Sequence, residues 1–596
     1  MCGIAGGIYW QGQPTVDDIQ QATTRLHHRG PDEQGVFIRD QVALGHARLS
    51  IIDLAGGTQP LHSPDDQLHL VANGEVYNYI ELKQQSTLPP GLTQSDSEAI
   101  LQTYREDGHT GIKRLNGMFA FALYDQVEKT LTLARDRLGI KPLYYAPTAR
   151  GLFFASELKA LLPLIGEQPE IDPSALNQFL MQQFSTGRDT VFKQIKRLQP
   201  GEYLVAKDGS YDVNSYWSMQ EVEQRECTLE QAFEEFEPLF AQVMTEHMRA
   251  DVPFGLFLSG GIDSSILLAE LAKLHDNKLR TYSIGFSDTK EADELDAATS
   301  LAEQFNTDHH AIRVGRDDLF GRIVKMTWAA DDLMRDYASL PTLYLAEQAA
   351  KDVKVVFSGE GGDEAFAGYR RYKPGIERWL KMNVLGSGIA PGNQWHAGSH
   401  KALYGSRLQH QDRKAPYMVL WNETPKHWSS MKRRQYVDLK AALVDNLFVK
   451  TDRMLMAHGL EGRVPLSDHR IVEFGMSLPD SLKYNNNRGK WVLRQWAEKY
   501  LPKDHLNKPK RGFYVPVKEW FAGDFVDQLE HKLLTNHAVG EWFRPAGIKD
   551  IFARQRAGKN YTREMWSLMQ FAIWHQLFID GEGAVPSTQE NPLDWI

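Results

Sequence analysis

The chain has 596 residues, with 67 Lys or Arg against 77 Asp or Glu, so its formal net charge at pH 7 is −10. This length predicts two or three domains, because single cores rarely grow beyond about 250–300 residues. The acidic balance argues against nucleic-acid binding, and no apolar run reaches the roughly 18 residues of a membrane span. With Cys2 and Cys227 as the only cysteines and no signal-peptide pattern, we expect a cytoplasmic protein without disulfides.

Residues 1 to about 205 contain short strand-like runs separated by turn residues. Apolar runs or alternation over four to eight residues are typical of strands. We predict strands over 41–46, 68–73, 118–125, 130–135 and 151–155, and helices over 16–26 and 97–106. This mixture predicts an α+β domain of packed layers.

A polar connector over 215–228 precedes a different pattern, in which longer helices alternate with short apolar strands. We predict helices over 230–249, 264–274, 293–305 and 340–351, and strands over 252–258, 279–286, 309–314 and 353–357. Such βαβα alternation predicts an α/β doubly wound parallel sheet. Residues beyond about 365 are predicted to be largely helical, with a loop over 384–412. The expected domains are 1–214 and 229–596.

Cys2 is the first candidate for chemistry. If Met1 is removed, Cys2 carries both a thiol and a free α-amine, which together can act as nucleophile and base. An α-amine has a pKa of about 7.7–8.0, against about 10.4 for Lys, so part of it is neutral at pH 7. The alternative interpretation is a buried thiol that only packs in a first strand.

Further motifs offer what attack on a carboxamide requires. Arg48 follows a predicted strand and can hold a carboxylate with its planar fork. Asn73 and the backbone N–H of Gly74 can stabilise an oxyanion, and Asp96 can pair with an ammonium group. Ser95 or Asp96 is expected to cap the helix over 97–106. Taken alone, each of these motifs is more simply explained by a turn or a salt bridge.

Together, the strings MCGI, HHRGPD, GHARLSIID, NGEVYN and TQSDSE resemble the glutaminase domain of N-terminal-nucleophile amidotransferases over about 200 residues. The resemblance implies a four-layer αββα sandwich that hydrolyses glutamine through a γ-glutamyl thioester and releases ammonia. It implies Cys2 as nucleophile with its α-amine as base, Asn73 and Gly74 as oxyanion hole, Arg48 as ligand of the glutamine carboxylate, and Glu75 and Asp96 as contacts of the glutamine ammonium.

A second candidate site begins at the string SGGIDSS over 259–265, between a predicted strand and an apolar helix. Two adjacent glycines let the backbone approach an anion, and a helix N-terminus supplies donors. The string SGEGGDE over 358–364 follows another strand, and ligands of open α/β sheets bind at that edge. Asp263 and Asp363 are therefore predicted to hold Mg²⁺. The loop lacks the Walker A ending, and a plain β–α turn with capping serines is the alternative.

SGGIDSS resembles the pyrophosphate loop of N-type ATP pyrophosphatases. Joined to a Cys2 glutaminase, it makes nearly the whole chain similar to glutamine-hydrolysing asparagine synthetases, and the match continues at 450–470, 488–496 and 508–516. The resemblance implies that ATP adenylates a side-chain carboxylate with release of pyrophosphate. Ammonia arriving through an internal tunnel then attacks the acyl-AMP.

The same resemblance assigns roles in the synthetase half. Glu360 is implied as base for the incoming ammonia, and Lys490 as stabiliser of charge near the reacting phosphate. Arg494 and Lys450 are weaker candidates, since a surface salt bridge explains each equally well. The residues implied to contact ATP are Leu258, Ser259, Gly260, Gly261, Asp263, Ser264, Ser283, Gly285, Ser358 and Gly359.

The match thins at 331–336, at Ser467-Asp468, at 373–415 and beyond 576. These segments leave the acceptor open between aspartate, which would give asparagine, and another carboxylate on a peptide, an osmolyte precursor or a sugar acid. A silent scaffold is a further hypothesis, which the presence of Cys2 and both loops argues against. We expect small-molecule substrates, and a homodimer is left open.

Overall fold

The computed structural model describes residues 1–275, 277–287, 295–383, 386, 388–390, 395–396, 398–507, 514–581 and 583–596. The start of the helix predicted over 293–305 and most of the motif at 508–516 lie outside these residues. Among the described helices, none is long and apolar enough to cross a membrane.

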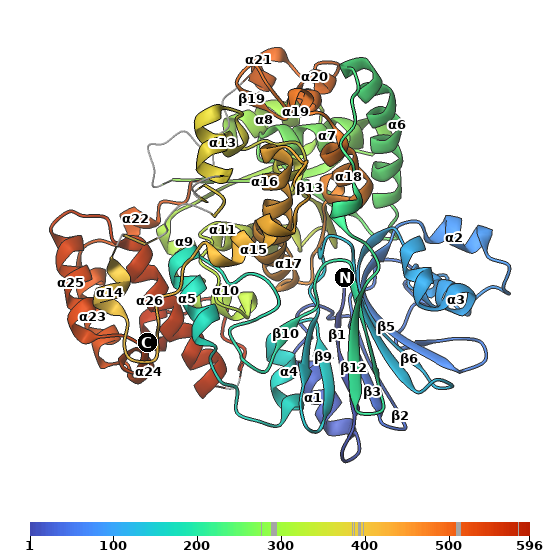
Figure 1. Cartoon of the computed structure of the whole chain (residues 1–596), viewed down its shortest axis with the longest axis horizontal. Helices are drawn as coiled ribbons and strands as arrows, with labels where there is room; N and C mark the ends of the chain where they lie inside the picture. The colour runs from blue at the N-terminus through green and yellow to red at the C-terminus, as the bar shows by residue number, and fades with distance from the viewer. Residues whose placement is uncertain are drawn as a thin grey trace.

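Two six-stranded antiparallel sheets form the N-terminal part of the chain (Figure 1). The first sheet has the order β10 (Lys196–Arg197), β8 (Tyr144–Pro147), β9 (Gly151–Ala155), β1 (Gly3–Tyr9), β3 (Val42–Arg48) and β2 (Glu33–Arg39). The second has the order β12 (Ser210–Ser215), β11 (Glu202–Lys207), β7 (Thr130–Arg135), β6 (Gly117–Asp125), β5 (Leu68–Val76) and β4 (Leu61–His62).

Alternation along the strands places these sheets face to face. In β1, Ile4 and Ile8 join the core between the sheets, whereas Ala5 and Tyr9 join the core on the outer face. The helices α1 (Val16–Thr24) and α4 (Leu158–Ile165) cover the first sheet, and α2 (Tyr79–Gln85) and α3 (Glu98–Asp107) lie beside the second. The order helix, sheet, sheet, helix confirms the predicted αββα sandwich.

A five-stranded parallel sheet organises the C-terminal part, in the order β15 (Asp308–Val314), β14 (Arg280–Phe286), β13 (Phe254–Phe257), β16 (Val355–Phe357) and β17 (Glu461–Arg463). The chain winds outward from β13 through β14 to β15, and then in the other direction through β16 to β17. Such a reversal opens a ligand crevice at the carboxyl ends of the two central strands. The doubly wound prediction is confirmed.

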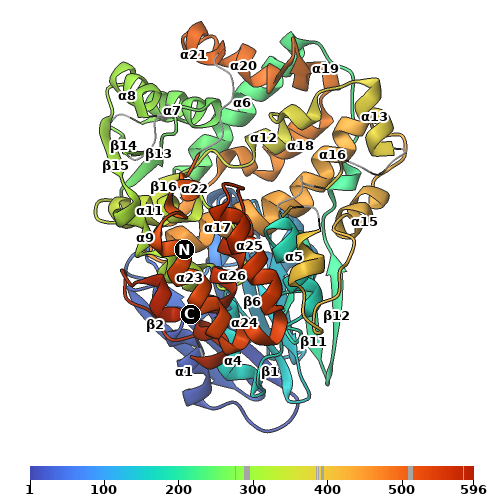
Figure 2. The same ribbon diagram turned by 90° about the vertical axis from the view of Figure 1, so that its left-hand side faces the viewer.

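Helices surround this sheet and form the outer part of the molecule (Figure 1, Figure 2). In chain order they begin with α6 (Leu229–His247), α7 (Ile262–Leu274), α8 (Leu295–Gln304), α9 (Arg316–Phe320), α10 (Ile323–Ala330), α11 (Ser339–Ala349) and α12 (Gly362–Ala365). The next are α13 (Ile376–Asn383), α14 (Ser399–Leu403), α15 (Ala415–Glu423), α16 (Ser430–Asp438), the π-helix Leu439–Phe448, α17 (Val449–Met456), α18 (His469–Ser477) and α19 (Asp480–Lys483). The earlier helix α5 (Pro173–Gln182) packs against the last helices of the chain.

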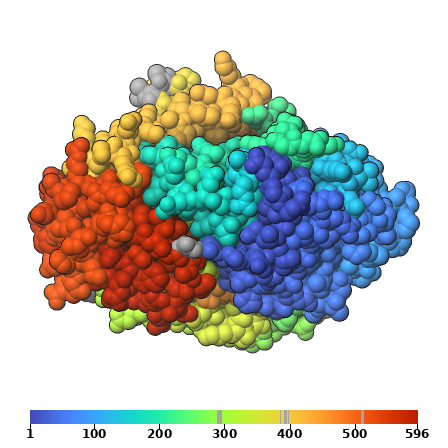
Figure 3. Space-filling view, turned by 90° about the horizontal axis from the view of Figure 1, so that it is seen from below, coloured from blue at the N-terminus to red at the C-terminus, as the bar shows by residue number. Residues whose placement is uncertain are grey.

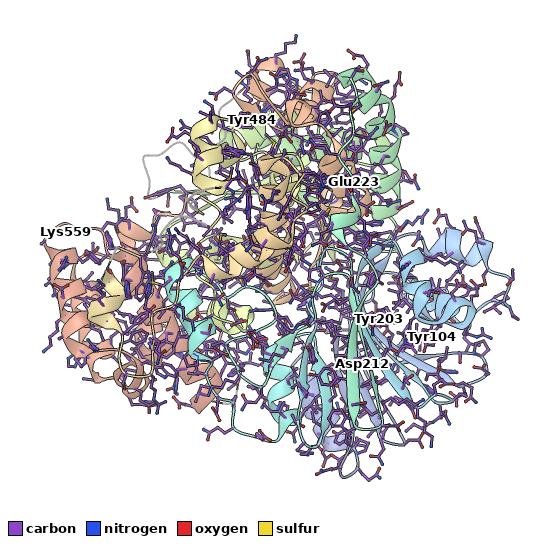
Figure 4. The ribbon with its side chains drawn as sticks, viewed as in Figure 1. Tyr104, Tyr203, Asp212, Glu223, Tyr484 and Lys559 are labelled. Atoms are coloured by element: carbon purple, nitrogen blue, oxygen red, sulfur yellow. The ribbon has the colours of Figure 1, made fainter. Side chains whose placement is uncertain are left out.

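The chain ends in a group of helices that packs against the N-terminal domain, as Figure 3 shows where the red and blue surfaces meet. After the hairpin of β18 (Tyr484–Asn485) and β19 (Arg488–Gly489), the helices α20 (Trp491–Ala497) and α21 (Lys503–Asn507) lie at the top of the molecule in Figure 1, and α20 contacts α6 and α19. The terminal group itself consists of α22 (Val517–Trp520), α23 (Asp524–Thr535), α24 (His537–Trp542), α25 (Pro545–Arg556) and α26 (Thr562–His575). Figure 4 places Tyr484 near the top of the molecule and Lys559 at the outer edge of this helical group. The hairpin that precedes Lys490 is therefore remote from the terminal helices.

Two local predictions are wrong. The first is the side-chain cap of the helix predicted over 97–106: the helix itself is present, but it begins at Glu98 and has no side-chain cap. Asp96 does not cap it because its carboxylate accepts the backbone N–H of Val76 at 2.7 Å, and the Ser95 hydroxyl accepts the N–H of Ser97 at 3.3 Å. The loop predicted over 384–412 contains α14, which forms because Leu403 is buried against the terminal helices.

Candidate active sites

Cys2 lies immediately before β1, where the N-terminal sheets meet the C-terminal domain (Figure 1). Its nitrogen, here a peptide nitrogen because Met1 precedes it, donates to Asn73 Oδ1 at 3.1 Å. Burial raises the pKa of the Cys2 thiol, although the nearby N-terminal amine and Arg48 act in the opposite direction. The Met1 ammonium is itself buried, 2.8 Å from Glu461 Oε2 of the C-terminal domain.

Asn73 presents a donor with no protein partner. Its Nδ2 is buried and makes no hydrogen bond within the described part of the chain, although buried donors are normally paired. The next residue, Gly74, has φ +143°, and a Cβ there would lie 2.0 Å from the carbonyl oxygen of Met118. The backbone at 74 therefore requires glycine, and the unpaired Asn73 amide beside the thiol suits an oxyanion.

The remaining residues predicted for glutamine binding lie around the same end of β5. Arg48 is buried, and it donates to Glu33 Oε2 at 2.9 Å and to the Asp53 carbonyl at 2.6 Å. Glu75 is 3.3 Å from the Arg463 guanidinium, and Asp96 binds the N–H next to Glu75 along the strand. Burial, followed by the charges of Glu461 and Asp96, raises the pKa of Glu75.

A cavity of about 750 Å³ opens beside this group, and the loop that Arg48 holds forms one wall. Its lining includes Asp53, Tyr79, Lys83 and Asp251. Asp251 comes from the C-terminal domain and accepts the N–H of Asp53 at 2.8 Å. Both domains therefore shape this opening.

The second site lies at the carboxyl ends of β13 and β16, where the sequence predicted it. Gly260 has φ +70°, and the Ser264 hydroxyl closes the turn by donating to the Gly261 carbonyl at 3.1 Å. The neighbouring loop approaches so closely that a Cβ on Gly359 would lie 2.8 Å from the Cβ of Asp263, and one on Gly362 would lie 2.7 Å from Asp263 Oδ1. These glycines allow the two loops to pack together.

Lys490 joins the two loops through its ammonium group. Its Nζ lies 2.5 Å from Asp263 Oδ2 and 2.8 Å from Asp363 Oδ1. Burial alone would lower the pKa of Lys490, but the two carboxylates outweigh burial and hold it above its ordinary value. A Cβ on Gly368 would lie 1.9 Å from Asp363 Oδ1. Carboxylates gathered this closely require cations, and oxygen ligands of this kind suit Mg²⁺.

Glu360 lies beside this pair of loops and is held by helix α17. Its Oε1 accepts from Thr451 Oγ1 at 3.2 Å and from Lys450 Nζ at 3.3 Å. The Ser467 hydroxyl donates to the Glu360 carbonyl at 2.9 Å. Lys450 is buried, so the surface salt bridge weighed for it is wrong. Arg494 is half-buried and donates to the Gly489 carbonyl at 2.9 Å, holding the turn before Lys490.

The other residues predicted to contact ATP follow the same strands. The Ser283 hydroxyl on β14 donates to the Leu258 carbonyl after β13, and both residues are buried. Gly285 lies one residue before the end of β14, and the N–H of Ser358 donates to the Arg463 carbonyl at 2.8 Å. The structure thus brings the ends of three neighbouring strands to the same edge of the sheet.

Sequence reasoning missed a layer of buried charges between the domains. Arg29 Nη1 donates to Asp452 Oδ2 at 2.7 Å and to Glu157 Oε1 at 2.8 Å. Asp331 accepts the backbone N–H of Lys159 at 2.9 Å, and Arg197 pairs with Asp332 at 2.5 Å. The charged residues Lys450, Asp452 and Arg453, directly before the apolar stretch 454–457, were the signal that could have revealed this layer. Asp331 and Asp332 lie in the segment where the resemblance thins, and both bind residues of the N-terminal domain across the domain interface.

Two family models match the chain, one over each half. A family model described as asparagine synthase matches residues 235–576, and one described as a glutamine amidotransferase domain matches residues 1–217. A Bacillus subtilis (strain 168) protein named asparagine synthetase [glutamine-hydrolyzing] 1 is 31% identical over 641 residues, covering 100% of both chains. The chain belongs to the asparagine synthase family.

Membership in this family makes the chain an enzyme, an ATP-using ligase of the glutamine-hydrolysing kind. Not all similar proteins are named asparagine synthetases. A Penicillium rubens protein named amidase chyE is 27% identical to this chain, and the alignment covers 98% of this chain and 100% of that protein. A solved glutamine phosphoribosylpyrophosphate amidotransferase of B. subtilis is 17% identical with TM-score 0.28, covering 61% of this chain and 77% of its own, which is too distant to carry an argument.

Proposed function

We propose that the enzyme makes asparagine from aspartate, glutamine and ATP. The observation that carries the proposal is that Lys490 reaches both Asp263 and Asp363 at the switch point of the parallel sheet. A cation between two carboxylates beside an anion-binding turn suits an ATP phosphate tail. The domains of this proposal are residues 1–214 and 229–596.

In the first domain, Cys2 attacks the glutamine carboxamide after Met1 is removed, and its freed α-amine takes the thiol proton. The unpaired Asn73 amide and the Gly74 N–H stabilise the oxyanion. The Arg48 guanidinium binds the substrate carboxylate, while Glu75 and Asp96 receive its ammonium. The cavity beside Asp53 is a suitable entry, because Arg48 holds its wall. The protonated α-amine then gives this proton to the amide nitrogen, the C–N bond breaks and ammonia leaves. Water next cleaves the thioester, which releases glutamate and restores the thiol.

In the second domain, the aspartate side-chain carboxylate attacks the α-phosphorus of ATP and pyrophosphate leaves. Asp263 and Asp363 would hold Mg²⁺, which neutralises charge on the phosphates. The Lys490 ammonium stabilises the negative charge that develops on the leaving pyrophosphate. Glu360 accepts a proton from ammonia as its nitrogen attacks the acyl-AMP, and AMP leaves. Leu258, Ser283 and Gly285 line the nucleoside side of the crevice.

A different carboxylate acceptor is the second candidate. It is favoured by Ser467, whose hydroxyl binds the Glu360 carbonyl where similar synthetases usually carry leucine. The name of the Penicillium relative also points away from a single product within the family.

A panel of carboxylates decides between these candidates. The enzyme with glutamine, ATP and Mg²⁺ should release pyrophosphate in proportion to amide, and aspartate should give the largest kcat/KM. A larger kcat/KM for another carboxylate would replace aspartate as acceptor, and amide without pyrophosphate would contradict adenylation. Cys2→Ala should abolish glutamine use but keep synthesis from free ammonia, whereas loss of both would make Cys2 structural.

A further inference from the structure

The last helices of the chain carry a cluster of metal-ligand side chains that neither reaction uses. His537 begins α24, His575 ends α26, and Asp580 ends the π-helix Gln576–Asp580 that continues α26. Each side chain offers one ligand atom, and the three atoms lie within 4.8 Å of one another. Figures 1 and 2 both place α24 beside α26 near the C-terminus, away from the parallel sheet.

The π-helix brings Asp580 to His575. In an α-helix each residue turns the chain by about 100°, so side chains five residues apart point about 140° away from each other. The i→i+5 hydrogen bonding of a π-helix widens the turn, and Asp580 Oδ2 lies 3.1 Å from His575 Nδ1. Such π-turns are rare and are frequent at functional sites. The segment beyond 576, where the resemblance to the family thins, therefore folds into a turn that presents a carboxylate to a histidine.

A second imidazole faces the same carboxylate oxygen. His537 Nε2 lies 3.6 Å from Asp580 Oδ2, and the two imidazole rings stand edge to face with their centroids 5.4 Å apart. An ordinary ion pair needs only one histidine. Zinc binds imidazole nitrogen and carboxylate oxygen at about 2.0–2.2 Å in tetrahedral geometry, which sets neighbouring ligand atoms about 3.3 Å apart. The distances from Asp580 Oδ2 to the two nitrogens, 3.1 and 3.6 Å, match that spacing.

The exposure of these side chains suits an ion that enters from solvent. The side chain of His575 is 9% exposed, that of Asp580 31% and that of His537 64%. The buried imidazole thus fixes one ligand, while the exposed one can turn onto the ion. Three protein ligands leave the fourth zinc position to water. Mg²⁺ prefers oxygen ligands, so two imidazoles select against it.

We propose that His537, His575 and Asp580 form a zinc site that joins α24 to the end of α26. The two helices already pack through Phe543, directly after α24, and Phe571 of α26, whose ring centroids are 5.4 Å apart. Zinc closes the open edge of this packing and stabilises the terminal helices.

The site also fixes the place where the chain leaves these helices. Directly beyond Asp580 the chain turns back, and the Gly583 carbonyl accepts from Nε1 of Trp328 in α10 at 3.2 Å. The N–H of Gly583 donates to the Leu577 carbonyl of the π-helix at 2.7 Å. Zinc bound to Asp580 therefore holds the start of this return.

The test measures zinc bound per chain by equilibrium dialysis of the full chain, in a Cys2→Ala background with excess Mg²⁺. The background removes a thiolate that could itself bind zinc, and Mg²⁺ competes for oxygen sites such as the pair Asp263 and Asp363. We expect one Zn²⁺ per chain and a rise in Tm when zinc is added. His537→Gln should weaken the zinc Kd at least about 100-fold, because even a lost partner of a metal ligand costs about 10–100-fold, and should cancel the rise in Tm.

Two further variants make the test decisive. Asp580→Asn should weaken zinc binding as well, which separates a three-ligand site from binding by imidazoles alone. His410→Gln is the matched control, because His410 stacks on His400 with centroids 3.9 Å apart, and within the described residues no three-ligand group forms around that pair. It should keep the zinc content and the rise in Tm. No zinc in the parent chain, an unchanged Kd in His537→Gln or Asp580→Asn, or an equal loss in His410→Gln overturns the inference.

Discussion

Replacing Asn73 by alanine should lower glutaminase activity strongly but change the stability of the fold little. Among the residues that the structure describes, Nδ2 of Asn73 is buried without a partner, which costs about 1–3 kcal/mol. Asn73→Ala removes this cost but loses the hydrogen bond from the Cys2 nitrogen, worth about 0.5–1.5 kcal/mol, and leaves a small void. We therefore expect the free energy of unfolding to change by about 1 kcal/mol or less.

Activity should fall much further, because one oxyanion donor is worth about 10²–10³ in kcat, or about 2.7–4 kcal/mol. The assay is glutamate release from glutamine, with ammonia-dependent pyrophosphate release measured on the same preparation. The first rate should drop at least 100-fold, and the second should stay within 2-fold.

Asn177 offers a matched control. It is buried in α5, its Nδ2 is likewise unpaired within the described residues, and its Oδ1 accepts from the Tyr404 hydroxyl at 2.8 Å. Asn177→Ala removes the same set of interactions without touching the site, so its unfolding free energy should change similarly while glutaminase activity stays intact. Equal losses of glutaminase activity in both variants, or a loss below 10-fold in Asn73→Ala, would refute the oxyanion role.

Three further outcomes are expected. Gly368→Ala should abolish pyrophosphate release but spare glutamate release, because the new methyl group displaces the Asp363 carboxylate; Gly540→Ala, where a Cβ meets nothing within 4 Å, should change neither rate, and similar losses in both would contradict this reasoning. Lys490→Met should lower pyrophosphate release about 10²-fold or more, and added Mg²⁺ should raise the Tm of the variant more than that of the wild type; an equal rise would argue against a cation site. Burial lowers the pKa of His46 to about 3, below its ordinary value, so the stability it contributes is present above about pH 6.5 and lost as pH falls toward 3. Between pH 6.5 and 4 this loss is about 3 kcal/mol, His46→Gln should remove it from urea unfolding curves, and an unchanged pH dependence would count against it.

Local patterns in the sequence were enough to predict the loops of the second site. A Gly-Gly turn between an apolar strand and a helix has few other uses, and two such turns placed Asp263 and Asp363 at one sheet edge. The distance from Lys490 to both carboxylates confirms that they meet. Their role in binding Mg²⁺, and the boundaries 1–214 and 229–596, stay predictions.

Contacts between distant segments were beyond a single sequence. Arg29 and Asp452 are 423 positions apart, and each appears in a motif that has a simpler local explanation. The capping prediction failed for the same reason, because Asp96 is drawn to the Val76 N–H by the neighbouring strand rather than by its own helix. Local sequence preferences predict the hydrogen-bond partners of such residues correctly only where no distant segment offers another partner.

The buried charges between the domains also limit how this enzyme can be rebuilt. A chimaera that took its first half from another family member would have to supply partners for Asp331 and Asp332, because a buried charge that loses its partner costs about 3–5 kcal/mol. Exchanges that carry residues 157–197 together with 331–332 keep these pairs intact. For recombination between relatives, crossover points between those two segments are the ones to avoid.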